Sequence, residues 1–116
     1  MNGLDATDRF FDVIAAELAP KLSAESLPLR SHWMIISDAQ GVTTCRLDDE
    51  TEGMAIDSVL ASHIDGGAAA AAFVTVHKQS VLAQTLTTEP RNSDLRRAPL
   101  INVSGELQLG PWVSEL

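Results

Sequence analysis

The run Asp48-Asp49-Glu50-Thr51-Glu52-Gly53 is the segment of this sequence whose residue types and spacing come closest to a known chemistry. Carboxylates at its first, third and fifth positions and a glycine at its sixth imitate the first half of an EF-hand calcium loop. That loop also needs a glutamate at its twelfth position, where this chain has Val59, and a helix directly before it. The sequence therefore does not predict an EF-hand.

Three interpretations of the acidic run stay open. The first is a solvated helix start, because carboxylates near the positive end of a helix are stabilised by its dipole. The second is a docking surface for a basic protein partner, and the third is weak cation binding. On the second interpretation the partner-binding residues are Asp48, Asp49, Glu50 and Glu52.

Three arginines form a second candidate site, in a segment from Glu89 to Arg97 that we expect to be a polar loop. Arg91, Arg96 and Arg97 fall within seven residues, and Asp94 interrupts them. Guanidinium groups bind carboxylates and phosphates bidentately, so this loop is suited to anchor an acidic ligand or a second copy of the chain. The alternative is a solvated loop with internal contacts between arginine and aspartate.

His32, Cys45, His63 and His77 are residue types that ligate zinc, but the gaps of 13, 18 and 14 residues between them match no short-spaced zinc motif. Cys45 falls in the middle of a predicted strand, where the side chain of Arg46 points to the opposite face. With no base beside it, Cys45 is predicted to be a buried structural thiol. We therefore predict no metal and no cofactor.

The chain contains no recognisable catalytic motif. Gly66-Gly67 lacks the third glycine and the Lys-Ser/Thr pair of a phosphate-binding loop, and neither a Gly-x-Ser-x-Gly elbow nor a His-Glu-x-x-His pair occurs. We therefore predict no catalytic residues. The alternative is a small-ligand binder or a small enzyme, with His77 and the three arginines around a pocket at a sheet edge.

The elements that position these residues follow from the apolar periodicity. Helical spacing predicts helices over about residues 7–19 and 52–63. Pro20 should end or bend the first helix, and Gly66-Gly67 should end the second. Alternating or β-branched runs predict strands over residues 31–37, 42–47, 73–76 (entered from the alanines at 68–72), 81–88, 100–104 and 106–109.

This order, α-β-β-α-β-β-β with a further short strand, predicts an α+β fold. Hairpin connections favour a mainly antiparallel sheet of five to six strands, with the two helices packed on one face. Gly110-Pro111 should end the last strand, and we expect Trp112 to fold back onto the domain.

Composition limits the classes of function. The 116 residues are 45% hydrophobic, which suits one aliphatic core in a single domain, 1–116. The net charge of −8 argues against direct binding of nucleic acid or of an anionic membrane surface. Residues 1–65 carry 12 acidic and 4 basic side chains, whereas residues 66–116 carry 4 of each. A single cysteine, with no signal-peptide pattern and no apolar run of membrane-spanning length, favours a cytoplasmic location.

The stretch Arg96-Arg97-Ala98-Pro99-Leu100-Ile101-Asn102-Val103-Ser104 resembles a segment of small uncharacterised bacterial and phage proteins of about this length. Those proteins also run helix, hairpin, helix and then strands, with an arginine-containing loop before a strand that ends in Val-Ser. This chain has Val76-His77-Lys78 where the resemblance would place Glu-Ala-Trp. The resemblance implies the order of elements and no particular activity.

Taken together, these features predict a small acidic, non-enzymatic module that binds a partner protein through an acidic surface, as inhibitors, immunity proteins and chaperones do. The favoured partner is a basic protein. A structural subunit of a homo-oligomer is the further alternative, including a homodimer that pairs the arginine loop with the acidic run.

Overall fold

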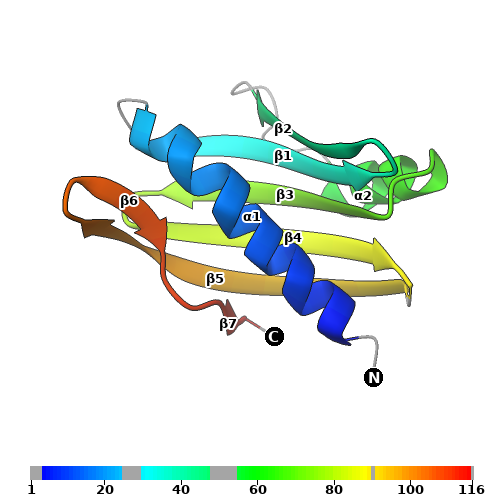
Figure 1. The fold of residues 1–116 in the computed structure, drawn as a ribbon. Coiled ribbons are helices and arrows are strands. Elements are labelled where there is room, and N and C mark those ends of the chain that lie inside the picture. Colours follow the sequence, from blue (N-terminus) through cyan, green and yellow to red (C-terminus); the bar gives the residue numbers. More distant parts are fainter. Residues whose placement is uncertain (1–3, 25–29, 48–54, 90, 116) are drawn as a thin grey trace.

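A computed structural model of the chain describes residues 4–24, 30–47, 55–89 and 91–115. This part of the chain forms two helices and a sheet of seven strands, whose arrangement can be followed in Figure 1. The elements are α1 (Leu4–Ala24), β1 (Arg30–Asp38), β2 (Gly41–Leu47), α2 (Ile56–Asp65), β3 (Ala70–His77), β4 (Ser80–Thr88), β5 (Arg91–Val103), β6 (Glu106–Leu109) and β7 (Val113–Ser114). The predicted α+β class is confirmed.

The sheet is antiparallel at every pairing among the described strands. Its order is β2-β1-β3-β4-β5-β6, and β7 pairs with β5 beside β6. The long strand β5 pairs with β4 through residues 91–99 and then with β6 through residues 100–103. This change of partner carries the sheet around the side of α1, against which β6 packs (Figure 1).

Helix α1 lies diagonally across one face of the sheet, here called the α1 face (Figure 1). Its Phe11, Ile14 and Leu18 are fully buried against side chains of the central strands, including Trp33 and Val74. The predicted apolar face of this helix is confirmed. In proteins most of the stability of a helix comes from such packing of its apolar face.

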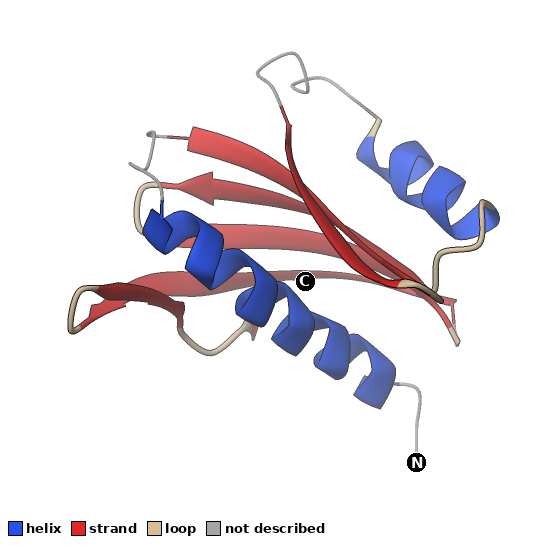
Figure 2. Ribbon diagram, turned by 45° about the horizontal axis from the view of Figure 1, so that its top comes forward, coloured by secondary structure: helices blue, strands red, loops and turns tan. Residues whose placement is uncertain are grey.

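Helix α2 lies on the opposite face, here called the α2 face (Figure 2). Its Leu60 and Ile64 pack against Met34 of β1, Ala71 of β3 and Leu86 of β4. Neighbouring residues of a strand point to opposite faces. Ala71 therefore packs against α2, whereas the adjacent Ala72 belongs to the cluster that packs against α1. The expectation that both helices pack on one face is therefore wrong.

The alanine run explains how both helices approach the same strand. The three residues Ala70, Ala71 and Ala72 are all buried at the start of β3, as predicted from the β-branched residues that follow them. Alanine prefers a helix, but pairing with β1 on one side and β4 on the other holds these residues extended. Small side chains on both faces let α1 and α2 lie close to the sheet.

Helix α1 continues through Pro20 to Ala24, although a proline was expected to end or bend it. Proline removes one backbone hydrogen bond, to the carbonyl of Ala16. Leu22 is 1% exposed and belongs to the same core cluster as Leu18, one turn earlier. Burial of this leucine offsets the lost hydrogen bond, so the last turn forms.

Replacing Pro20 by alanine tests this account. Pro20 is exposed, and the substitution restores the hydrogen bond to Ala16 without disturbing the core. We expect the free energy of unfolding to rise by about 1–2 kcal/mol, measured by urea denaturation, after allowance for the greater freedom of the unfolded chain. The exposed neighbour Lys21→Ala serves as the control and should change it by less than about 0.5 kcal/mol. A loss of stability in Pro20→Ala would contradict the argument.

The segment predicted to be a polar loop, residues 89–97, is mostly strand β5. Asn92, Asp94 and Arg96 alternate toward the α1 face and are polar, so the segment has no apolar alternation to indicate a strand. Their side chains find specific partners instead; for example, the Asn92 amide donates to the Thr7 hydroxyl over 2.9 Å. Such pairing lets a polar strand be half-buried beside α1.

The end of the chain folds back as predicted. The Trp112 indole N–H donates to the Phe11 carbonyl over 3.1 Å, and the centres of the Trp112 and Phe11 rings are 5.0 Å apart. No helix in the described residues is long and apolar enough to cross a membrane.

Candidate functional site

The acidic residues proposed to bind a partner, Asp48, Asp49, Glu50 and Glu52, lie outside the described residues. The structure does describe the residues that flank this segment. Leu47 ends strand β2, and Ala55 directly precedes α2. Leu47 and Ile56 both pack against the apolar cluster between α2 and the sheet.

Strand β2 is the edge strand at this side of the sheet and pairs only with β1 among the described strands. The direction of its free backbone groups follows from Ser37, whose carbonyl accepts the Ala69 N–H on the β3 side over 2.8 Å. Val42 faces Ser37 in the ladder, and this pair cannot also be hydrogen-bonded to each other. The N–H and C=O of Val42 therefore point to the open edge.

Cys45 lies on this edge strand and is exposed, so the prediction of a buried thiol is wrong. It pairs with Met34 and shares the α2 face, but α2 packs chiefly over β3 and β4. Arg46 points to the opposite face, as predicted, with its guanidinium 6.0 Å from the centre of the Trp33 ring. An edge strand has a neighbour on one side only, and this leaves the thiol open to reagents.

The three arginines of the predicted loop do not form one anchor. Because they lie on strand β5, Arg96 points to the α1 face while Arg91 and Arg97 point to the other. Arg91 pairs with Thr88, and His77 lies at the opposite end of the β3–β4 hairpin. The strand geometry therefore does not bring these four side chains together in one site.

Arg96 is held within the fold. Its guanidinium binds Asp94 at 2.9 Å and Asp8 of α1 at 2.8 Å, and lies 4.4 Å from the centre of the Phe11 ring. Its side chain is 17% exposed. Arg96 therefore ties the N-terminal part of α1 to β5. Its pair with Asp94 is the internal arginine–aspartate contact that the alternative expected, although it lies on a strand and not in a solvated loop.

Arg97 and Arg91 lie in more open surroundings. Arg97 is about half exposed and pairs with Glu115, with a second contact to the Ser80 hydroxyl. Arg91 lines a groove of about 420 Å³ between α2 and the sheet, with Asp57 on its far wall. Asp57 accepts a hydrogen bond from Gln84.

The histidines serve separate parts of the structure. His32 is buried, stacks on Phe73 at 5.4 Å and meets the Thr75 hydroxyl at 3.1 Å. His63 is half-buried on α2, and His77 is exposed at the end of β3. In the parts of the chain that the structure describes, no three histidine, cysteine or carboxylate side chains gather as a metal site would require.

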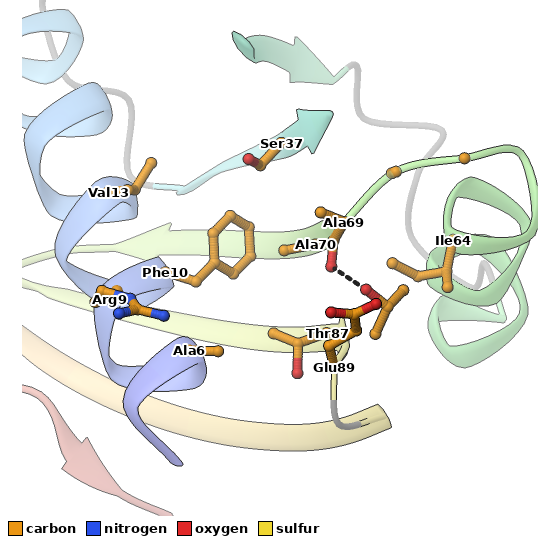
Figure 3. A pocket seen from close by; sticks show the side chains of 13 residues that line it. Ala6, Arg9, Phe10, Val13, Ser37, Ile64, Ala69, Ala70, Thr87 and Glu89 are labelled. Atoms are coloured by element: carbon orange, nitrogen blue, oxygen red, sulfur yellow. Dashed lines mark hydrogen bonds between the residues drawn. The ribbon is translucent and has the colours of Figure 1, made fainter. Parts of the chain in front are cut away.

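Sequence reasoning missed the pocket shown in Figure 3, at the end of the sheet between α1 and the strand ends. It is lined by Arg9 and Phe10 from α1, Ser37 from β1, and Glu89 beyond β4. Arg9 and Glu89 are 80 residues apart in sequence, and neither belongs to a motif. Only the register of the sheet and the path of α1 bring them to the same pocket.

A cluster of exposed aliphatic side chains lies at the other end of the sheet. Ile101, Val103 and Val113 are 42%, 44% and 62% exposed, respectively. Ile101 and Val103 alternate with Leu100, which faces the α1 core, so they point outward. Val113 pairs with Arg97 on the same outer side.

No protein-family model matches this chain, and comparisons with curated proteins and with solved structures find no match either. What bears on its function is therefore the contacts, burial and charges of its own residues.

The difference between the two arginine pairs is testable by stability measurements. Arg96→Ala leaves Asp94 half-buried without its cation, so we expect the free energy of unfolding to fall by about 2–3 kcal/mol. Arg97→Ala removes a largely solvated pair and should cost less than about 1 kcal/mol. Urea denaturation of both variants measures this, and equal losses would contradict the assignment of Arg96 as the tie between α1 and β5.

Proposed function

We propose that this chain is a non-enzymatic, cytoplasmic protein-interaction module that binds an extended, basic segment of a partner protein along the edge of β2. The observation that carries the proposal is the position of β2, an edge strand that leads directly into the acidic run Asp48-Asp49-Glu50-Thr51-Glu52. An extended peptide can add to such an edge as a further strand, with main-chain hydrogen bonds providing affinity.

The composition of β2 supports this use of the edge. Proteins protect exposed edges with lysine, proline, bulges or a covering element. Strand β2 contains neither lysine nor proline, and its one charged side chain, Arg46, points to the α1 face. Val42, Thr43 and Cys45 are exposed along it. An incoming strand would therefore meet neither a charged barrier nor a steric one at these positions.

Charge supports a basic partner. The ion pairs among the described residues use Arg96 and Arg97, and these two bind Asp8, Asp94 and Glu115. Acidic side chains near β2 and α2, such as Asp38 and Asp65, form no ion pair with any other described residue. The surplus negative charge thus lies in the half of the sequence that contains β2 and α2, where it would steer a basic segment toward the edge.

Substitution of Val42 tests the edge of β2 directly. The assay uses a binding partner that is captured from a native lysate and then purified. Val42→Pro removes the outward N–H and leaves the hydrogen bonds between β1 and β2 in place. We expect it to weaken binding about tenfold, measured by surface plasmon resonance. Val42→Thr keeps both the N–H and a β-branched side chain, and its affinity should stay within about twofold of the original.

Charge reversal tests the acidic run. Replacing Asp48, Asp49, Glu50 and Glu52 by lysine should slow association by at least about tenfold at low salt and flatten its dependence on ionic strength. The matched control reverses four acids remote from β2: Asp12, Glu17, Glu106 and Glu115. It alters net charge equally and should slow association by a smaller factor.

Cys45 reports where the partner lies. Its thiol is exposed on β2, so a strand bound there should slow its alkylation by N-ethylmaleimide. Unchanged alkylation in the complex, together with equal affinity of Val42→Pro and Val42→Thr, would show that the partner binds elsewhere. A dimer of this chain in sedimentation that Val42→Pro converts to a monomer would likewise overturn the proposal of a basic partner, because a second copy would then occupy β2.

A further inference from the structure

The pocket at the end of the sheet has two walls of different origin. One is the N-terminal part of α1, which presents Arg9 and Phe10, and the other is formed by the strand ends, with Glu89 just beyond β4 (Figure 3). Its volume of about 700 Å³ is within the range of small-molecule sites. The pocket is separate from the edge of β2, and nothing in the proposed function uses it.

The charged groups of the pocket are opposite in sign and unused by the fold. Arg9 projects from α1, and the Glu89 carboxylate lies on the facing wall (Figure 3). Neither has an ion-pair partner among the described residues. By contrast, Arg96 is bound by two carboxylates, Asp94 of the same strand and Asp8 of α1. An unpaired cation and an unpaired anion across one pocket are suited to a ligand that carries both charges.

The base of the pocket is apolar and firmly held. Phe10 is 4% exposed, and Ala70 and Ile64 are also buried there. The strand wall is fixed because the carbonyl of Ala69 accepts both the N–H and the hydroxyl of Thr88, at 3.1 and 3.2 Å (Figure 3). A ligand would therefore find preformed apolar contacts between the two charges.

We propose that this pocket binds a small zwitterion with an aliphatic body, of the size of a dipeptide. The ligand carboxylate binds the Arg9 guanidinium, and the ligand ammonium group binds the Glu89 carboxylate. The aliphatic side chains lie against Phe10 and the alanines of the strand wall. The net charge of the pair Arg9 and Glu89 is zero, which favours a zwitterion over a simple anion or cation.

Titration of the ¹⁵N-labelled chain with the dipeptide Leu-Leu tests the proposal. Amide shifts should change at Ala68, Ala69 and Thr88, with saturation in the millimolar range or below. Acetyl-Leu-Leu lacks the ammonium group and Leu-Leu-amide lacks the carboxylate, so each should bind about fivefold more weakly. Arg9→Gln should weaken Leu-Leu about fivefold without affecting Leu-Leu-amide, and Glu89→Gln should weaken Leu-Leu without affecting acetyl-Leu-Leu.

Two controls keep the test decisive. Lys21→Gln removes an exposed cation from the same helix outside the pocket and should leave all affinities unchanged. Ala69→Phe places a large ring in the pocket from an exposed position, and should abolish binding while urea denaturation shows a folded chain.

Absence of shift changes up to about 10 mM Leu-Leu would overturn the proposal, as would full binding by Ala69→Phe. Equal binding of all three peptides would also overturn it, because the charges would then play no part. None of these results depends on β2, so they are distinct from a failure of the partner-binding proposal.

Discussion

Burial of β3 on both faces is the constraint on which the rest of the structure depends. Its residues Ala70–Val76 sit between β1 and β4 and alternate between two separate apolar clusters. A strand buried on both sides needs a covering layer on each. The chain supplies α1 on one face and α2 on the other, and alanines at the start of β3 let both helices approach. The placement of the two helices follows from this three-layer arrangement.

The two helices cover the sheet unequally, and the open regions are where binding is proposed. Helix α1 crosses its face diagonally, so the end of the sheet beside Arg9 and Glu89 stays open as a pocket. Helix α2 is shorter and packs chiefly over β3 and β4, which leaves the edge strand β2 exposed at Cys45. Both proposed sites thus lie at the periphery of the sheet, which the two helices leave uncovered.

The sequence predicts the elements better than their arrangement. Periodicity identified both helices and most strands, because side-chain spacing reflects local backbone geometry. It could not assign α2 to a face, since a helix stripe is the same whichever side of a sheet it covers. The strand β5 was missed because its half-buried residues are polar and give no apolar pattern. Asn92 is satisfied by Thr7, which is distant in sequence, and the Asp94 carboxylate by the Leu95 N–H and by Arg96. Cys45 was placed correctly on a strand, but its exposure depends on which strand is the edge.

The charges divide into those the fold uses and those it leaves free. Arg96 lies over the Phe11 ring between two carboxylates, where replacing it would leave Asp94 half-buried and uncompensated. Arg9, of the same residue type and one position after Asp8, has no such partner among the described residues and faces the pocket. Residue type alone cannot distinguish the two arginines, because the difference lies in the residues that the fold places around each guanidinium group. Free charge beside an apolar surface therefore distinguishes Arg9 and Glu89, the proposed binding residues, from Arg96, whose charge the fold itself uses.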